Sequence, residues 1–351
     1  MDAFQRVRCA SAVAWRASVV VSLANKRLVW ASWNQLVGAN RANLQDMLQT
    51  YYRADVDGCG GHPINDMSGT EALAAIFWEP LFEAVPDVVR RTDIITGGTW
   101  NGQQWVSGTG YFVGTFVKDW LGIPAHGQTV YIRFGEFCRI EDNRIAQTRI
   151  LFDLPDVMRQ VGYRVLAPSL GEEVIVPGPA AGDGILLREA DPDISRTSQM
   201  LVEAMIEGLR AYDGVALESQ NMPAFWHDDM EWYGPLGHGT YHTLHDFIYV
   251  YEKAFFNGLQ PTEFGGVKRV AFYSDGLYST VAGWPSIRAV QGGDYLGAAA
   301  TNREIELRVM DWWRRKDDLL SENWVFIDVP HVFDQLGIDV FQQLREAAHK
   351  S

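Results

Sequence analysis

Cysteine is scarce in this sequence of 351 residues, which contains only Cys9, Cys59 and Cys138. An odd number of cysteines, at spacings unlike those of metal ligands, indicates neither a disulfide framework nor a zinc site. Structural disulfides belong to oxidising compartments, so this composition is typical of a protein of the reducing cytoplasm. We therefore expect a cytoplasmic localisation.

The sequence also lacks a long apolar run and an excess of basic residues. Arg16, Lys26 and Arg27 flank the apolar patch at 19–21, which is too broken to span a membrane and lacks a convincing signal-peptide cleavage site. With 30 Lys and Arg against 44 Asp and Glu, the net charge is −14. Nucleic acids and anionic membranes require basic surface, so we expect neither as a partner. A small-molecule substrate is compatible with this charge.

What the chain does contain is an internal repeat. The stretch 121–162 returns without a gap at 296–337, 175 residues later, with eleven identities in 42 positions. About half of the other positions exchange one apolar residue for another, as at Val130 and Ile305. Self-similarity at a fixed offset indicates a repeated structural unit. We therefore predict two copies of one domain.

The pattern of the repeat predicts an α+β fold. Residues 128–140 and 145–153 alternate apolar and polar around an Asp-Asn turn, which is typical of a β-hairpin, and a short helix opened by Pro follows. Helical periodicity precedes the strands in both copies. Helices on one side of a curved antiparallel sheet form a cone with one open mouth. The predicted parts are an N-terminal extension without an assignable role (1–42), a first domain (43–163), a Pro- and Gly-rich linker (164–195) and a second domain (196–351).

One carboxylate interrupts the last apolar strand of each copy. Asp153 follows an apolar run at 150–152, and Asp328 follows another at 325–327. An ionised carboxylate in such surroundings is costly unless it is paired, and burial raises its pKa, which suits general acid/base catalysis. Both residues also stand two positions before a Pro that opens a helix. Each is therefore also a candidate N-cap, which is the commoner role of Asp at such a junction.

The first copy contains the segments HPINDMSGTEAL, GYFVGTFVKDWLGIPAHG, FCRIEDNRIAQ and LFDLPDVMRQVG. In these segments, within 44–163, it resembles the SnoaL-like polyketide cyclase family of the nuclear-transport-factor-2-like superfamily. The second copy, 196–340, resembles the family most at IDVPHVFDQLG and lacks the Gly-Ile-Pro turn.

This resemblance implies a cystatin-like or nuclear-transport-factor-2-like cone-shaped α+β barrel with an apolar pocket, and no metal or organic cofactor. It also implies ring closure by intramolecular aldol condensation, with a pocket Asp near the end of the last strand as acid/base. Asp153 and Asp328 occupy the matching positions.

Residues two and four positions before each Asp are candidates for the same pocket, because side chains alternate faces along a strand. Beside Asp153 this places Arg149, a cation that would lower the pKa of the Asp. Beside Asp328 it places Trp324 and Phe326, an aromatic wall that would raise the pKa. We therefore expect Asp328 to be the better acid/base.

Further substrate-binding candidates are His62, His238, His242 and Trp232. His238 and His242 have the i, i+4 spacing of metal ligands, but a glycine lies between them and no third ligand stands out, so no metal is expected. The resemblance places polar pocket residues near His62. Trp232 is one of many aromatic residues in the second copy and a candidate for the wall of a pocket.

Two charged positions also recur in register, Arg133 with Arg308 and Glu136 with Asp311. The arginine and the acid have opposite parity on their strand, so without a bulge they cannot both face a pocket. We interpret them as sheet-surface or interface charges.

These observations favour a cyclase, isomerase or lyase that uses a pocket Asp on an oxygenated cyclic or polyketide-like substrate. The alternative is a non-catalytic protein that binds a small apolar ligand in the same cone. In a third interpretation the two copies pair through their sheets as an intramolecular pseudo-dimer, with which a homo-oligomer is compatible.

Overall fold

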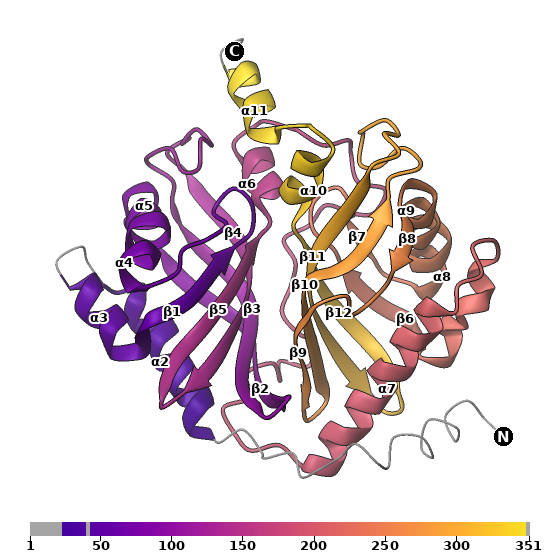
Figure 1. The fold of residues 1–351 in the computed structure, drawn as a ribbon, viewed down its shortest axis with the longest axis horizontal. Coiled ribbons are helices and arrows are strands. Elements are labelled where there is room, and N and C mark those ends of the chain that lie inside the picture. Colours follow the sequence, from indigo (N-terminus) through magenta and orange to yellow (C-terminus); the bar gives the residue numbers. More distant parts are fainter. Residues whose placement is uncertain (1–22, 40–42, 349–351) are drawn as a thin grey trace.

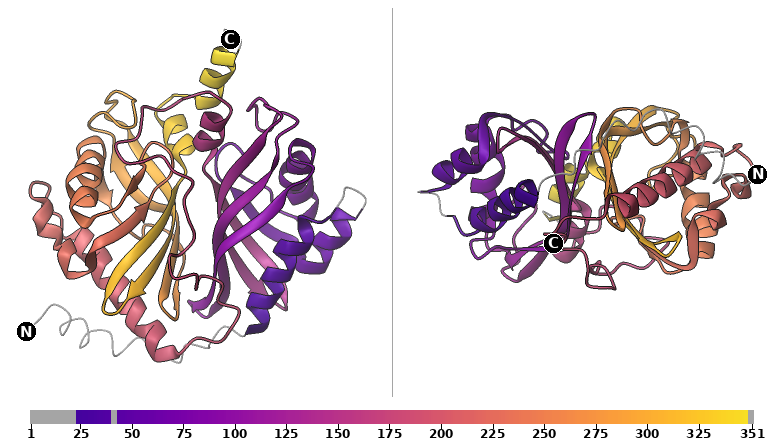
Figure 2. Two further views of the ribbon diagram at one scale, coloured as in Figure 1. Left: turned by 180° about the vertical axis from the view of Figure 1, so that it is seen from behind. Right: turned by 90° about the horizontal axis from the view of Figure 1, so that it is seen from below.

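The computed structural model describes residues 23–39 and 43–348. They form two curved sheets that face each other along the middle of the molecule, with most helices on the outer sides (Figure 1; Figure 2). The predicted α+β class, with two tandem cone-shaped units, is confirmed.

The first domain has a five-stranded sheet. Its helices are α2 (Leu23–Leu36), α3 (Leu44–Tyr51), α4 (Thr70–Ala72), the π-helix η2 (Leu73–Trp78), α5 (Glu79–Ala84) and α6 (Leu154–Gln160). Its strands are β1 (Tyr52–Gly60), β2 (Val89–Trp100), β3 (Gln103–Thr115), β4 (Thr129–Glu141) and β5 (Arg144–Phe152). The strand order is β1-β5-β4-β3-β2, antiparallel except for the pair of β1 and β5.

The second domain repeats this order with a divided edge. Its helices are α7 (Pro192–Arg210), η3 (Leu217–Gln220), η4 (Met222–Ala224), α8 (Leu244–Asp246), the π-helix η5 (Phe247–Glu252), α9 (Lys253–Gly258), α10 (Val329–Gln335) and α11 (Val340–Ala348). Its strands are β6 (Trp226–Tyr233), β7 (Thr240–Tyr241), β8 (Gln260–Glu263), β9 (Arg269–Asp275), β10 (Tyr278–Val290), β11 (Glu304–Lys316) and β12 (Leu319–Ile327). The order is β7-β6-β12-β11-β10-β8, and β9 also pairs with β10.

The repeated hairpins are present in both domains. Asp142 and Asn143 have positive φ angles of 50° and 56°, as a type I′ turn requires, and Asp317 has 51° in the second hairpin. The parallel strands β1 and β6 were not predicted. Both carry charged residues, such as Asp57 and Asp229, that obscure the alternation of a strand.

Helix α2 lies in the segment to which the sequence assigned no role, and it packs on the sheet of the first domain. Val29 and Trp33 on this helix are fully buried. Gly108 on β3 makes room for the indole, because a Cβ there would lie 2.8 Å from the Trp33 ring. The helix is therefore part of the core of the first domain.

The two sheets share one apolar cluster between them. It contains Ile94, Trp105, Phe137 and Leu151 of the first domain together with Tyr273, Met310, Trp312, Trp324 and Phe326 of the second. Tyr273 donates a hydrogen bond to Ser107 at 2.7 Å, and Trp312 donates to the same hydroxyl at 3.2 Å. A buried ion pair at 2.9 Å joins Lys26 of α2 to Asp275 of β9. The faces of the sheets that meet here are therefore largely filled by each other's side chains.

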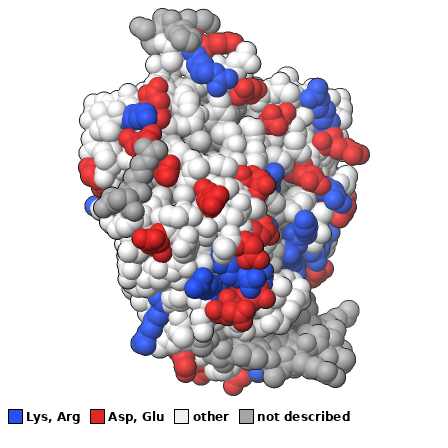
Figure 3. All heavy atoms as spheres, turned by 60° about the vertical axis from the view of Figure 1, so that its left-hand side comes forward, with Lys and Arg blue, Asp and Glu red and all other residues white. Residues whose placement is uncertain are grey.

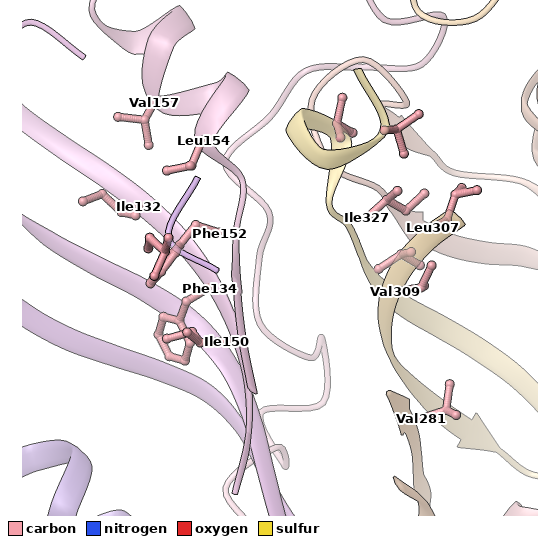
Figure 4. Packing of buried hydrophobic residues seen from close by; sticks show 14 of the residues in the cluster. Ile132, Phe134, Ile150, Phe152, Leu154, Val157, Val281, Leu307, Val309 and Ile327 are labelled. Atoms are coloured by element: carbon pink, nitrogen blue, oxygen red, sulfur yellow. The ribbon is translucent and has the colours of Figure 1, made fainter. Parts of the chain in front are cut away.

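The opposite face of each sheet carries the interior of its own cone. Figure 4 shows some of the buried apolar residues of these cone interiors, including Phe134 and Phe152 in the first domain and Val309 and Ile327 in the second. Both faces of each sheet are thus apolar.

Between α6 and α7 the chain runs without helix or strand along both domains. Leu186 donates a backbone hydrogen bond to Ile95 of the first domain, and Glu172 exchanges two with Thr240 of the second. Within the described part of the chain, no helix combines the length and the apolarity that crossing a bilayer would need. On the face shown in Figure 3, acidic and basic side chains are interspersed.

Candidate functional site

Asp328 lies between the two domains. Its side chain is 2% exposed and accepts hydrogen bonds from the backbone N–H of His62 at 3.0 Å and of His331 at 3.3 Å. The guanidinium of Arg308 donates to the same carboxylate at 3.2 Å. The carboxylate therefore caps α10 and also holds a loop of the first domain.

Asp153 makes the equivalent contacts from the first domain to the second. It accepts hydrogen bonds from the N–H of Asp156 at 3.3 Å, which caps α6, and from Leu236 of the second domain at 2.8 Å. Arg133 donates to the carbonyl oxygens of Tyr233 and Gly234 in the same loop of the second domain. Each aspartate thus anchors, across the interface, the loop that precedes the π-helix of the other copy.

The predicted location of these aspartates inside the cones is wrong. Asp328 does share a face of its strand with Trp324 and Phe326, but that face meets the other sheet. Burial raises the pKa of both acids, for Asp153 to about 7, and the nearby Arg308 and Arg133 oppose the rise. Their raised pKa values follow from burial at the interface between the domains, where Asp153 lines only a small cavity of about 20 Å³.

An Asp328→Asn substitution tests the anchoring role. The amide retains the shape but replaces one acceptor oxygen with an NH2 group that would face the donors of His62 and Arg308, so we expect the free energy of unfolding to fall by about 1 to 2 kcal/mol. Urea unfolding measures the change. Asp334→Asn, on the exposed side of the same helix, is the matched control. Equal stability of the two variants would contradict the anchoring role.

Three further candidates also lie outside the cones. Arg149 pairs with Asp57 at 2.7 Å beside β1 and does not contact Asp153. Trp324 donates its indole N–H to the carbonyl oxygen of Pro177 in the linker at 2.9 Å. Arg133 lies over the ring of Phe326 at 4.4 Å. Arg149, Trp324 and Phe326 therefore make contacts outside the cone interiors. The cation that lowers the pKa of Asp153 is Arg133 and not the predicted Arg149.

The predicted histidines are separated. The ring of His62 packs against Phe341, with centroids 5.9 Å apart, while its N–H is bound by Asp328. His242 is partly exposed and pairs with Glu231 at 2.5 Å. His238 is buried and lines a cavity of the second domain. Across residues 23–39 and 43–348, no three His, Cys, Asp or Glu side chains are grouped as metal ligands.

The interior of the second cone contains a cavity of about 110 Å³. Its walls are mainly aromatic and include Trp226, Trp232, Phe247, Tyr251, Phe264 and Trp313. Its polar side chains are Glu252, Ser286, Asp311 and Asn323, and no Lys or Arg is found among the described residues that line it. Trp232 is therefore the predicted aromatic residue that does line the cone interior.

Asp311 is the central polar group of this cavity. Its neighbours on β11, Met310 and Trp312, belong to the interface cluster, so Asp311 points the opposite way, into the cone. Burial raises the pKa of Asp311 to about 7, and a hydrogen bond from Asn323 limits the rise. This carboxyl group changes its charge near neutral pH and faces open space.

The first domain has a carboxylate at the same place but neutralises it. Glu136 lies opposite Ile150 on the neighbouring strand, and Asp311 lies opposite Val325. Both residues of the second pair follow their counterparts in the first by 175 positions, which is the offset of the repeat. Glu136 forms a buried ion pair with Arg90 at 2.9 Å and accepts a hydrogen bond from Thr148 at 3.0 Å.

Aromatic rings surround this ion pair. The guanidinium of Arg90 lies between the rings of Trp33 and Phe134, 3.9 and 4.0 Å from their centroids. Among the described residues, no Arg or Lys pairs with Asp311 and no rings enclose such a pair, so the two cones differ in the chemistry that their carboxylates can perform.

A second acid faces the same cavity. Glu252 ends the π-helix η5, at the place where Trp78 ends η2 in the first domain. It is 2% exposed and its Oε2 has no hydrogen-bond partner among the described residues. Burial raises the pKa of Glu252 to about 8, and the side chain of Gln220 opposes the rise. π-helical turns often occur at functional sites.

The cavity lies close to the surface where the edge of the sheet is divided. In the first domain this edge is the continuous β2, but in the second it breaks between β8 and β9 at Gly265 and Gly266. A surface groove of about 460 Å³ lies at this break and shares Leu209, Phe256 and Phe264 with the cavity. The groove and the cavity therefore adjoin each other at these three side chains.

Asp311 and Glu252 were not predicted as site residues. The recurrence of Glu136 and Asp311 was noticed, but both were interpreted as sheet-surface or interface charges. That assignment fits Arg133 and Arg308, which lie at the interface, and is wrong for the two acids, which face the cone interiors. The sequence did contain evidence for the correct placement. The arginine and the acid lie three residues apart on one strand and so point to opposite faces of the sheet, and one of them had to face the cone interior.

Comparison with known proteins concerns mainly the first domain. Residues 33–161 match the family model of the SnoaL-like polyketide cyclases. These residues carry the family's sequence signature, and the second copy lies outside the match. No curated protein matches the chain.

Two solved structures each match about two fifths of this chain over nearly their whole length. One from Jannaschia sp. CCS1, described as a SnoaL-like polyketide cyclase, has 20% identity and a TM-score of 0.34, and the match covers 41% of this chain and 94% of that one. A SnoaL-like polyketide cyclase from Agrobacterium tumefaciens has 19% identity and a TM-score of 0.31, with 39% and 98% covered.

Proposed function

We propose that the second domain is a small-molecule enzyme site in which Asp311 is the general acid/base. The observation that carries this proposal is the difference between equivalent carboxylates: Glu136 is tied to Arg90, whereas Asp311 faces a cavity lined by no described cation. A base is most effective when its pKa lies near the working pH, and the pKa of Asp311 is about 7. The substrate would be a largely apolar, oxygenated cyclic or polyketide-like molecule.

The chemistry proposed is proton abstraction next to a carbonyl group. The Asp311 carboxylate takes a proton from the carbon, and the resulting enolate carbon attacks a second carbonyl carbon of the same molecule. The new alkoxide then takes the proton back from Asp311, so that one carbon–carbon bond forms and no atom is lost. Glu252, with a pKa of about 8, is mostly protonated at pH 7 and can donate a hydrogen bond to an oxygen in the cavity.

Deuterium exchange tests this role without knowledge of the natural substrate. The probe is 2-tetralone, a neutral bicyclic ketone, and NMR follows protein-dependent deuterium incorporation beside its carbonyl group in D2O. We expect Asp311→Asn to lower this rate on the order of 100-fold, because the amide cannot accept the proton. The wild-type rate should rise with pH through about 7, as the carboxylate forms.

The control is Asp318→Asn in the exposed turn of the same hairpin, which should exchange at the wild-type rate. Asp311→Asn exchanging at the wild-type rate would refute the catalytic role. Wild-type protein that binds 2-tetralone without exchange would favour the alternative, a binding protein whose affinity comes from the aromatic walls.

A further inference from the structure

A second cavity, of about 200 Å³, adjoins the first. It is lined by His238, Tyr241 and Tyr295, by residues 294–297, and by Ala167 and Pro168 of the linker. Tyr251 and Phe255 line both cavities and so form the wall between them. Tyr251 lies close enough to Tyr295, Glu252 and Asp311 for each of them to raise its pKa.

His238, one of the residues that line this cavity, has a ring nitrogen without a hydrogen-bond partner among the described residues. The residue is 4% exposed, its Nε2 lies 2.9 Å from the hydroxyl of Tyr295, and its Nδ1 has no partner among the described residues. Burial lowers its pKa to about 3, so the imidazole is neutral at physiological pH. The Tyr295 hydroxyl can donate to Nε2, and in that tautomer the proton of the neutral ring sits on Nδ1 and is available to an acceptor. A buried polar atom left unpaired is costly, and a ligand oxygen would satisfy it.

The position of His238 is fixed by contacts from outside the second domain. Asp153 holds the N–H of Leu236, and Ser169 of the linker accepts the N–H of Gly237 at 3.0 Å. The hydroxyl of Tyr241 donates to the carbonyl oxygen of His238 at 3.0 Å. Three bonds on consecutive residues therefore hold the backbone at His238, and the contact of Nε2 with Tyr295 holds the ring, which is what a binding group requires.

The charge of the lining restricts the ligand. The two cavities together contain the acids Glu252, Asp294 and Asp311 and no Lys or Arg among their described lining residues. Since His238 stays neutral, no positive charge is available to hold a carboxylate or phosphate. The walls are aromatic, which suits flat apolar rings.

We propose that the cavity beside His238 is a second ligand compartment, in which His238 Nδ1 binds a carbonyl or hydroxyl oxygen of an uncharged aromatic or polycyclic molecule. A longer ligand would extend past Tyr251 to Asp311. The link to Asp311 rests on the proposed function, whereas the compartment itself does not.

Binding of three naphthalene compounds to the full-length protein tests the compartment. The probes are 2-naphthol, naphthalene and 2-naphthoate at pH 7, followed by calorimetry. We expect 2-naphthol to bind saturably and more tightly than naphthalene, and 2-naphthoate to bind more weakly than either. His238→Phe keeps a flat ring but removes the nitrogen, so it should weaken 2-naphthol binding about threefold to tenfold and leave naphthalene unchanged.

Nitrogen NMR of the wild-type protein provides a readout that does not depend on a variant folding. It should show the His238 proton on Nδ1, with a shift that moves on addition of 2-naphthol and not of naphthalene. Absence of saturable 2-naphthol binding, equal affinity for naphthalene, tight binding of 2-naphthoate, or a His238→Phe variant with unchanged affinity would each overturn the proposal. Asp318→Asn, in an exposed turn outside both cavities, should bind 2-naphthol like the wild type, and failure of the proposed function is detected separately by the 2-tetralone exchange rate of Asp311→Asn.

Discussion

The Glu252→Gln variant is expected to be more stable than the wild-type protein at pH 8, by about 4 kcal/mol, and equally stable at pH 4. Gln resembles the protonated acid in shape and polarity but cannot ionise. In the wild-type protein the unfolded chain loses this proton above pH 4.5, whereas the folded protein keeps it until the pKa of about 8. The folded state binds the extra proton over this range, so wild-type stability falls as the pH rises through it.

Urea unfolding of both proteins from pH 4 to pH 9 measures this difference. The control is Glu189→Gln, an exposed carboxylate that should give a nearly constant difference from the wild type. Asp311 and Asp153, whose pKa values are also raised to about 7, add to the decline in both proteins and cancel in the comparison. A Glu252→Gln variant no more stable than the wild type at pH 8 would show that Glu252 is ionised in the folded state.

Trp33→Ala should lower the free energy of unfolding by about 4 kcal/mol, the cost typical of removing a large buried aromatic side chain. Trp33 is fully buried, and its indole covers the guanidinium of Arg90 at 3.9 Å. Its loss would leave a cavity beside an ion pair that depends on being enclosed. Urea unfolding of the variant and of the wild-type protein measures this loss of free energy of unfolding.

The matched control for this change is Gln35→Ala, on the exposed side of the same helix. We expect that variant to stay within about 0.5 kcal/mol of the wild type. If Trp33→Ala also cost less than about 1 kcal/mol, α2 would be an accessory helix and not the closure of the first cone.

Much of the fold was readable from the sequence because the repeat is regular. The hairpins and the short helices α6 and α10 follow from alternation, turn residues and the position of Pro, all of which are local signals. The strands β1 and β6 were missed because they carry charged residues that obscure the alternation of a strand. The packing of Trp33 against Gly108 and Arg90 in the first cone was missed because these residues are far from α2 in the sequence.

The site was harder to predict because each sheet is buried on both faces. When one face of a strand is exposed to solvent, its polar residues identify that face. Here the interface and the cone interior are both apolar, so the alternation of residues cannot distinguish the two faces. Asp328, Trp324 and Phe326 were correctly grouped by parity and placed on the wrong side. Asp153 and Asp328 were equally open to interpretation as helix caps, and the structure shows both making those hydrogen bonds.

The π-helices of the two copies end in different residues, Trp78 in one and Glu252 in the other. Two identical chains paired about a symmetry axis would carry the same residue at both places, and any change that opened one barrel would open its twin. Joining the copies in one polypeptide removes that constraint. One half can then specialise as rigid support while the other accumulates the buried acids and empty space that reduce its own stability.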